Sequence, residues 1–245
     1  MKNPDFIIAG YQKCGTTALW KNLQQHPKIY MASRLLYAMP DYPEIDFFNE
    51  KTKASTWNNG FDWYKSLFKE GFVCGEKSPS YAYCASNIQK QLPDVKIILS
   101  IRNPVDRAFS AFYFYKRMLP ESKDWDTDKN NWKPERSFLH NFIDNNIFKN
   151  TGQYVNSIRR FYKHFPSNQI HIIIHEKLVN NYQEEYNKIF NFLSLDSIPI
   201  INNIAHKTHK PRELFEEERD LLSAYYKPYN EELFQFLGYE IKEWN

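Results

Sequence analysis

The amino-acid sequence predicts an α/β fold, a single domain in which helices flank a central parallel β-sheet. Two observations predict it. Short, nearly continuous apolar runs alternate with longer amphipathic segments, and strands that are apolar on both faces are typical of parallel sheets covered by helices. In addition, the 245 residues suffice to bury one sizeable core. We therefore expect residues 1–245 to form one domain.

The elements follow from local pattern and from helix-ending residues. Apolar runs predict strands at residues 5–9, 72–75, 95–102 and 170–175, with a short strand at 28–31. Proline marks several helix ends, because it is tolerated in the first turn and not in the interior. Helices are expected at residues 16–25, 61–68, 85–92, 104–116, 138–147, 153–165, 182–193 and 215–226.

One connection is unusually long for a compact domain. Residues 119–135 (LPESKDWDTDKNNWKPE) are polar and rich in turn formers. Structureless connections of this length are uncommon unless they serve a function. We therefore expect this segment to be a surface excursion or a lid.

Composition narrows the class of protein. The formal net charge of +3 is small for the chain length, and a dedicated nucleic-acid binder would carry clustered basic residues. The three cysteines are widely spaced and suggest unpaired thiols in a reducing compartment. No apolar stretch is long enough to span a bilayer. We expect a cytoplasmic protein without nucleic-acid or membrane partners, and the sequence carries no signal for an oligomeric state.

The segment GYQKCGTT, residues 10–17, is typical of a phosphate-binding loop. Gly10 and Gly15 keep the spacing of the Walker pattern G-x-x-x-x-G-K-[ST], but Thr16 stands where the lysine belongs and the basic residue comes earlier, as Lys13. Backbone N–H groups at a helix start form an anion cradle. The early lysine favours a shorter anion than a triphosphate and one that needs no metal.

Two further clusters also follow predicted strands. Glu76-Lys77-Ser78-Pro79 follows one strand, and Arg102 ends another, with Ser110 about two turns into the next helix. In parallel sheets, ligands bind outside the carboxyl ends of the strands. An arginine and a hydroxyl can together hold a terminal phosphate, so Arg102 and Ser110 are a second candidate anion site.

The motifs GYQKCGTTAL, GEKSPSY and IRNPVDRAFSAF together resemble the sulfotransferase superfamily that uses 3′-phosphoadenosine 5′-phosphosulfate (PAPS), in particular its heparan-sulfate-type branch and bacterial relatives of that branch. The resemblance continues through GQYVNSIRRFYKHFP and IIIHEKL to the tail KPYNEELFQFLGYE, nearly the whole chain. It implies PAPS as donor, adenosine 3′,5′-bisphosphate (PAP) as product, and no metal.

The resemblance also implies roles for single residues. Arg102 and Ser110 would hold the 3′-phosphate, and Lys207 and Lys210, in AHKTHKPREL, are both candidates for a phosphate contact. The 5′-phosphosulfate would be held by the loop residues Lys13, Cys14, Gly15, Thr16 and Thr17.

The implied catalytic base is Glu44, because PEIDFF is similar to a K-E-x-H-F-F-like segment of the heparan-sulfate-type enzymes; Pro43 and Asp46 depart from that pattern. Lys13 would stabilise the charge that grows on the leaving oxygen. Lys77 would act near the sulfuryl oxygens or steer the acceptor.

Together these features predict a metal-independent sulfotransferase that acts on a hydroxyl or amine of a small metabolite or natural product. The acidic stretch at residues 41–46 favours a neutral or cationic acceptor over a polyanionic glycan. A heparan-sulfate-like glycan acceptor, a P-loop nucleotide kinase and a non-catalytic donor-binding module are the alternatives.

Overall fold

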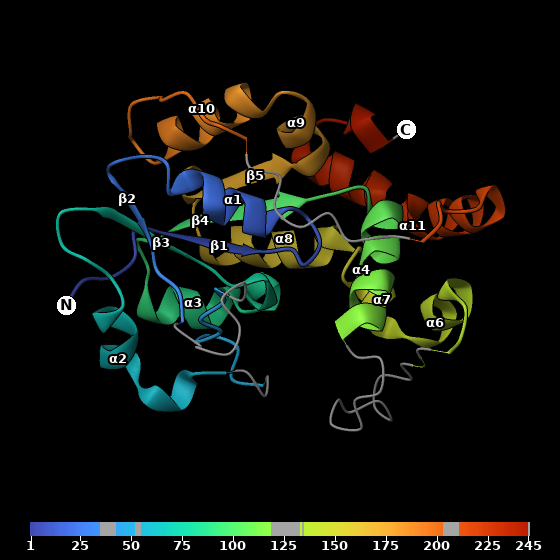
Figure 1. Ribbon diagram of the computed structural model, residues 1–245, viewed down its shortest axis with the longest axis horizontal. Helices are drawn as coiled ribbons and strands as arrows, with labels where there is room; N and C mark the ends of the chain where they lie inside the picture. Colours follow the sequence, from blue (N-terminus) through green and yellow to red (C-terminus); the bar gives the residue numbers. More distant parts are fainter. Residues whose placement is uncertain (35–42, 52–54, 119–132, 134, 203–210, 245) are drawn as a thin grey trace. The chain divides into compact units, whose positions relative to one another are not determined.

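The computed structural model describes residues 1–34, 43–51, 55–118, 133, 135–202 and 211–244. Five strands form one sheet in the order β2-β3-β1-β4-β5, and every pair of neighbours is parallel (Figure 1). The strands are β1 (Phe6–Gly10), β2 (Ile29–Met31), β3 (Val73–Lys77), β4 (Lys96–Ile101) and β5 (Ile170–Ile174). The predicted α/β class with a central parallel sheet flanked by helices is confirmed, and all five predicted strands are present.

By contacts, the chain divides into two compact units. Unit 1 contains Met1–Ile101 and Ser157–Ala205, and unit 2 contains Arg102–Asn156 and His206–Asn245. The sheet lies wholly in unit 1. The expectation of one domain over residues 1–245 stays a prediction, as does the excursion at 119–135, because residues 119–132 and 134 lie outside the described residues.

The sheet of unit 1 is buried on both faces because its strands are apolar at consecutive positions. Successive strand residues point to opposite faces, and both Ile7 and Ile8 are 0% exposed, as are Ile97 and Ile98. One face packs on α1 (Thr16–Leu23) and α10 (Tyr182–Phe192), whose buried side chains join those of the strands in one apolar cluster. The other helices of unit 1 are α2 (Phe61–Ser66), α3 (Ala85–Gln91) and α9 (His175–Asn180); α8 (Tyr154–His164) crosses the division between the units.

Unit 2 is helical and has a core of its own. Its helices are α4 (Pro104–Met118), α6 (Phe138–Asp144), α7 (Asn146–Asn150) and α11 (Glu216–Leu237). Asn103 starts α4, since its side-chain oxygen accepts the N–H of Val105 at 3.0 Å, with Pro104 in the first turn. Aromatic side chains of α4 and α6 pack against Leu222 and Tyr226 of α11.

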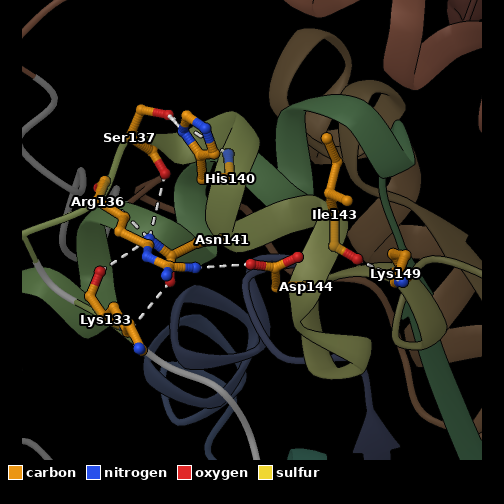
Figure 2. Close-up of polar contacts among 8 residues, drawn as sticks. All are labelled: Lys133, Arg136, Ser137, His140, Asn141, Ile143, Asp144 and Lys149. Atoms are coloured by element: carbon orange, nitrogen blue, oxygen red, sulfur yellow. Dashed lines mark hydrogen bonds and ion pairs between the residues drawn. The ribbon is translucent and has the colours of Figure 1, made fainter.

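The chain before α6 is tied to that helix by a buried amide. The Asn141 side chain, 1% exposed, donates to the carbonyl oxygens of Lys133, Arg136 and Ser137 at 2.9, 3.3 and 3.1 Å (Figure 2). Its oxygen accepts the Lys133 N–H at 3.1 Å, and the Ser137 side chain caps the helix through the His140 N–H. The Lys133 and His140 N–H groups and three carbonyl oxygens at this helix start therefore have their partners within the segment.

The last predicted helix is longer than expected. The predicted helix covers residues 215–226 and stops short of Pro228, and a proline inside a helix removes one hydrogen bond and crowds the preceding turn. Instead α11 continues to Leu237. Leu222 and Tyr226 are buried before the proline and Leu233 after it, so burial of both halves outweighs the local penalty.

Candidate active site

The predicted phosphate loop connects β1 to α1 and is held against β4. The Tyr11 N–H donates to the Ser100 carbonyl at 2.8 Å, and the Ser100 hydroxyl donates to the Cys14 carbonyl at 2.6 Å. Within the loop the Cys14 N–H closes a turn onto the Tyr11 carbonyl at 3.1 Å. Ser100 is 0% exposed. A buried serine of the neighbouring strand therefore holds the loop backbone at two points, Tyr11 and Cys14.

Two loop residues have left-handed backbone conformation, Lys13 with φ +69° and Gly15 with φ +80°. At Gly15 the backbone also comes close to another element: a Cβ built there would lie 2.6 Å from Nδ1 of His175. Only glycine meets both conditions without displacement. The loop can thus reach the start of α1 while its backbone lies against the imidazole of His175.

The start of α1 has the chemistry of an anion site. Among the described residues no side chain caps the helix at Gly15, and the first turn contains no acidic residue. Thr16 and Thr17 place two hydroxyls in that turn, and Lys13 lies three residues before it. Exposed N–H groups, hydroxyls and a helix dipole suit a phosphate or sulfate group.

Lys77 ends β3 beside this loop. β3 pairs with β1, so that Lys77 is opposite Ile8. Its ammonium, 1% exposed, forms an ion pair with the Glu44 carboxylate and donates to the Thr17 hydroxyl at 3.2 Å. Burial lowers the pKa of Lys77, while the charge of Glu44 and the hydrogen bond to it oppose that shift. The fold thus brings together three residues that the sequence placed in separate motifs.

The two oxygens of Glu44 have different surroundings. Oε1 contacts Lys77, whereas Oε2 is buried and has no hydrogen-bond partner among the described residues. The Glu44 side chain is 12% exposed. One carboxylate oxygen is thus engaged by a cation, while the other, within the described part of the chain, has free acceptor capacity for a proton.

The segment that carries Glu44 is anchored to the turn after β3. The Ser78 hydroxyl accepts the N–H groups of Ile45 and Asp46, each at 3.1 Å. The Asp46 carboxylate accepts the Ser80 hydroxyl at 2.5 Å and is 2% exposed. Asp46 therefore faces the protein interior, which weakens the sequence argument that this acidic stretch selects a cationic acceptor.

Arg102 and Ser110 lie in unit 2. Arg102 follows β4 directly and is partly buried, and its carbonyl accepts the Tyr154 hydroxyl at 2.8 Å. Ser110 is 3% exposed on α4. On the same helix Arg107 is fully buried, and its guanidinium donates to the Phe148 carbonyl. Arg107 therefore supports the packing of unit 2.

The remaining predicted positions separate into two groups. Cys14 is 0% exposed with its thiol directed to the Gln12 carbonyl at 3.8 Å, so it packs inside the loop. Lys207 and Lys210 lie outside the described residues. In the described ranges there is no group of three or more His, Cys, Asp or Glu side chains that could hold a metal ion, and no helix is long and apolar enough to cross a membrane.

Reasoning from the sequence missed four residues that shape the site. Ser100 and His175 confine the loop, while Glu76 and Ser78 organise the Glu44 segment. Glu76 and Ser78 were visible in the motif GEKSPSY and His175 in IIIHEKL. Their roles are evident only from contacts with residues far away in the sequence, and those contacts depend on the tertiary fold.

The chain belongs to the sulfotransferase family: the family model described as "Sulfotransferase domain" matches residues 3–220. This confirms the predicted superfamily, whose donor is PAPS. The chain is 27% identical over 219 residues to the bifunctional heparan sulfate N-deacetylase/N-sulfotransferase 1 of Caenorhabditis briggsae, covering 84% of this chain and 24% of that protein. It is 28% identical over 202 residues to human heparan sulfate glucosamine 3-O-sulfotransferase 5, covering 78% of this chain and 54% of that protein. The chain thus spans a quarter to about half the length of these two curated relatives.

Solved structures agree on the fold. The crystal structure of a sulfotransferase from Alicyclobacillus acidocaldarius aligns with a TM-score of 0.78 at 23% identity, covering 100% of this chain and 99% of that one. The sulfotransferase STF9 from Mycobacterium avium aligns with a TM-score of 0.54 at 13% identity, over 94% of this chain and 76% of that one. At these identities the likeness extends to the fold alone.

Proposed function

We propose that this protein transfers a sulfuryl group from PAPS to a hydroxyl or amine of an acceptor, with Glu44 as the general base. One observation carries the proposal. The Glu44 carboxylate is paired with the buried ammonium of Lys77, which also contacts Thr17 in the first turn after the phosphate loop. A base, a cation and an anion cradle are thus adjacent within unit 1.

The donor would be held by its two phosphate ends. The loop from Lys13 to Thr17, including Cys14, Gly15 and Thr16, would bind the 5′-phosphosulfate through backbone N–H groups, hydroxyls and the lysine. Arg102 and Ser110 would bind the 3′-phosphate. Lys207 and Lys210 are proposed as further phosphate contacts. The uncapped start of α1 and the absence of acidic side chains in its first turn, among the described residues, support this assignment for the loop.

In the reaction, the acceptor oxygen or nitrogen forms a bond to sulfur while the bond from sulfur to the 5′-phosphate oxygen breaks. The acceptor proton goes to Oε2 of Glu44, and the negative charge moves to the leaving phosphate. Lys13 stabilises that growing charge, and Lys77 balances charge near the sulfuryl oxygens. The ion pair with Lys77 also holds the Glu44 carboxylate in place.

For the acceptor we propose a small metabolite or natural product, processed in the cytoplasm as part of secondary metabolism. The curated relatives named above carry heparan sulfate in their names, which makes a glycan acceptor the specific rival. The buried Asp46 gives no charge to the acceptor surface, so charge at this position does not decide between them.

The first experiment measures donor binding without any acceptor. Isothermal titration of PAP into the purified protein should show binding that needs no Mg²⁺. Absence of PAP binding, or turnover of ATP that depends on Mg²⁺, would refute the proposal and favour a P-loop kinase.

The second experiment measures transfer from radiolabelled PAPS to two probe acceptors, p-nitrophenol and N-desulfated heparan sulfate. Transfer to the phenol supports a small acceptor, and transfer only to the glycan supports the rival. Glu44→Gln should lower turnover by roughly 10²-fold or more and leave PAP affinity within about threefold. Glu50→Gln makes the same chemical change on an exposed side chain six positions away and should leave both unchanged. Equal turnover in Glu44→Gln and Glu50→Gln would exclude Glu44 as the base.

A further inference from the structure

Three consecutive N–H groups of the segment that carries Glu44 donate to two buried hydroxyls. Those of Ile45 and Asp46 donate to the Ser78 hydroxyl, and that of Phe47 donates to the Tyr81 hydroxyl at 2.6 Å. Ser78 and Tyr81 are both 0% exposed. The main chain next to the proposed base is therefore held by hydroxyl groups rather than by regular secondary structure.

The hydrogen-bond capacity of Ser78 determines where its proton goes. A serine hydroxyl has two acceptor sites and one proton. Both acceptor sites are used by main-chain N–H groups, which can only donate, so the proton must be given away. It goes to Oε2 of Glu76 at 2.8 Å, while the Tyr64 hydroxyl donates to Oε1 of Glu76 at 2.8 Å. In this arrangement both oxygens of Glu76 act as acceptors, the role that a carboxylate fills without a competing proton.

Glu76 is 0% exposed. Burial raises its pKa to about 7, hydrogen bonds from Tyr64, Ser78 and Tyr81 oppose the shift, and the nearby charge of Asp46 adds to it. These four residues approach Glu76 from α2, from the turn after β3 and from the Glu44 segment. The donors that Glu76 organises thus oppose the effect of burial on its pKa.

Lys77, the next residue of β3, contacts the same segment through the Glu44 side chain. Successive side chains of a strand point to opposite faces, so Glu76 and Lys77 extend in opposite directions from β3. Lys77 pairs with the Glu44 side chain, and Glu76 acts through Ser78 on the main chain of the next two residues. Both the head group and the backbone of the proposed base are anchored to the end of one strand.

We propose that Glu76 is a positioning residue: its carboxylate orients the Ser78 hydroxyl, which fixes the Ile45 and Asp46 amides and so sets Glu44 beside Lys77. The proposal rests on the function proposed above, in which Glu44 is the base. In this role Glu76 contacts neither the donor nor the acceptor. Its effect is on the geometry of proton transfer, where a displacement of about 1 Å is enough to lower the rate by up to about 10²-fold.

Protonation of Glu76 should move activity and stability in opposite directions. When Glu76 is protonated, one of its oxygens carries a proton and becomes a donor. The Ser78 and Tyr64 hydroxyls, which donate to the carboxylate, then compete with that proton. Turnover should therefore fall as the pH falls through about 7, the pKa of Glu76. Because that pKa lies above the unfolded value of 4.5, the contribution of this group to stability is greatest below pH 4.5 and is lost as the pH rises through 7.

Hydrogen exchange tests the hydrogen-bond chain without an acceptor or turnover. Glu76→Gln and Ser78→Ala should each raise exchange of the amides at residues 45–47 at least about tenfold, with β4 unchanged. Ser78→Thr keeps the hydroxyl and should restore protection. Ser66→Ala removes an exposed hydroxyl of α2 that donates to its own helix and is the matched control. Unchanged exchange in both Glu76→Gln and Ser78→Ala would overturn the proposal whether or not the protein is a sulfotransferase.

The kinetic test uses radiolabelled PAPS and whichever of the two probe acceptors turns over. Glu76→Gln should lower kcat at least about tenfold with PAP affinity within about threefold, and the decline of kcat near pH 7 should disappear. Tyr64→Phe removes a hydrogen bond that lowers the pKa of Glu76, so the decline should move to higher pH. If Glu76→Gln keeps both the kcat and the pH profile of Ser66→Ala, the positioning role is wrong. If the unmodified protein transfers no sulfuryl group, the proposed function is refuted. The hydrogen-exchange result still shows whether the hydrogen-bond chain from Glu76 through Ser78 exists.

Discussion

Gly15, before α1, is the position where one added methyl group tests the loop most directly. Its φ is +80°, and a Cβ built there lies 2.6 Å from Nδ1 and 2.9 Å from Cε1 of His175. Gly71 offers a matched control, because its φ is +82° and a Cβ there meets no described atom within 4 Å. Alanine at either position imposes the same backbone strain, and only Gly15→Ala adds a collision.

The magnitudes follow from these two contributions. The left-handed region costs an alanine about 1–2 kcal/mol, and the less flexible unfolded chain returns about 0.4–1 kcal/mol. Gly71→Ala should therefore lower the free energy of unfolding by about 1 kcal/mol. In Gly15→Ala the imidazole of His175 must move, and overpacking of this kind adds about 1–3 kcal/mol. The total for Gly15→Ala is about 2–4 kcal/mol.

Two measurements check this reasoning. Urea unfolding followed by circular dichroism gives the free energies, and calorimetry gives the affinity for PAP, which should fall at least about tenfold in Gly15→Ala and stay unchanged in Gly71→Ala. The double variant Gly15→Ala/His175→Ala should regain part of the stability, because the imidazole that blocks the new methyl is gone. Equal unfolding midpoints and equal PAP affinities for Gly15→Ala and Gly71→Ala would refute the packing described for the loop.

Three further predictions concern stability. Gly75→Ala should lower the free energy of unfolding by about 1–3 kcal/mol, since a Cβ there would lie 2.2 Å from Cζ of the core residue Phe6; an unchanged urea midpoint would contradict it. Asn141→Leu should lower it by about 1–3 kcal/mol, because the Lys133 N–H and the carbonyls before α6 lose their partner. By contrast, Arg136→Gln should change it by less than about 1 kcal/mol, since its ion pair with Asp144 is about 40% exposed on both sides. Thermal unfolding compares Asn141→Leu with Arg136→Gln. Equal losses of stability in these two variants would contradict the structural role given to the Asn141 amide.

The elements of the sheet were predictable because each strand is a local pattern. Residues 95–102 form a continuous apolar run, and β4 spans Lys96–Ile101. The end of α11 was not predictable from Pro228. The local penalty of the proline is visible in the sequence, but the burial of Leu233 beyond it depends on contacts with distant segments.

The candidate site also has a part that was predictable from the sequence and a part that was not. The motifs pointed to Glu44 and Lys77 separately, and no spacing in the sequence indicates that the two side chains pair across 33 positions. Glu76 stood in view beside Lys77 but had no visible role. Its importance comes from Ser78, whose hydrogen bonds reach back to Ile45 and Asp46.

By itself the sequence determined the α/β class, the position of the glycine-containing loop with its early lysine, and the family, because these depend on local patterns of residues and on motifs in fixed order. Only the tertiary structure decided which groups meet: Lys77 with Glu44 and Thr17, and the buried Glu76 with the serine that holds the segment carrying Glu44. The physical reason is that pairing, burial and the resulting pKa shifts arise between segments far apart in the chain, where local pattern carries no information about distance.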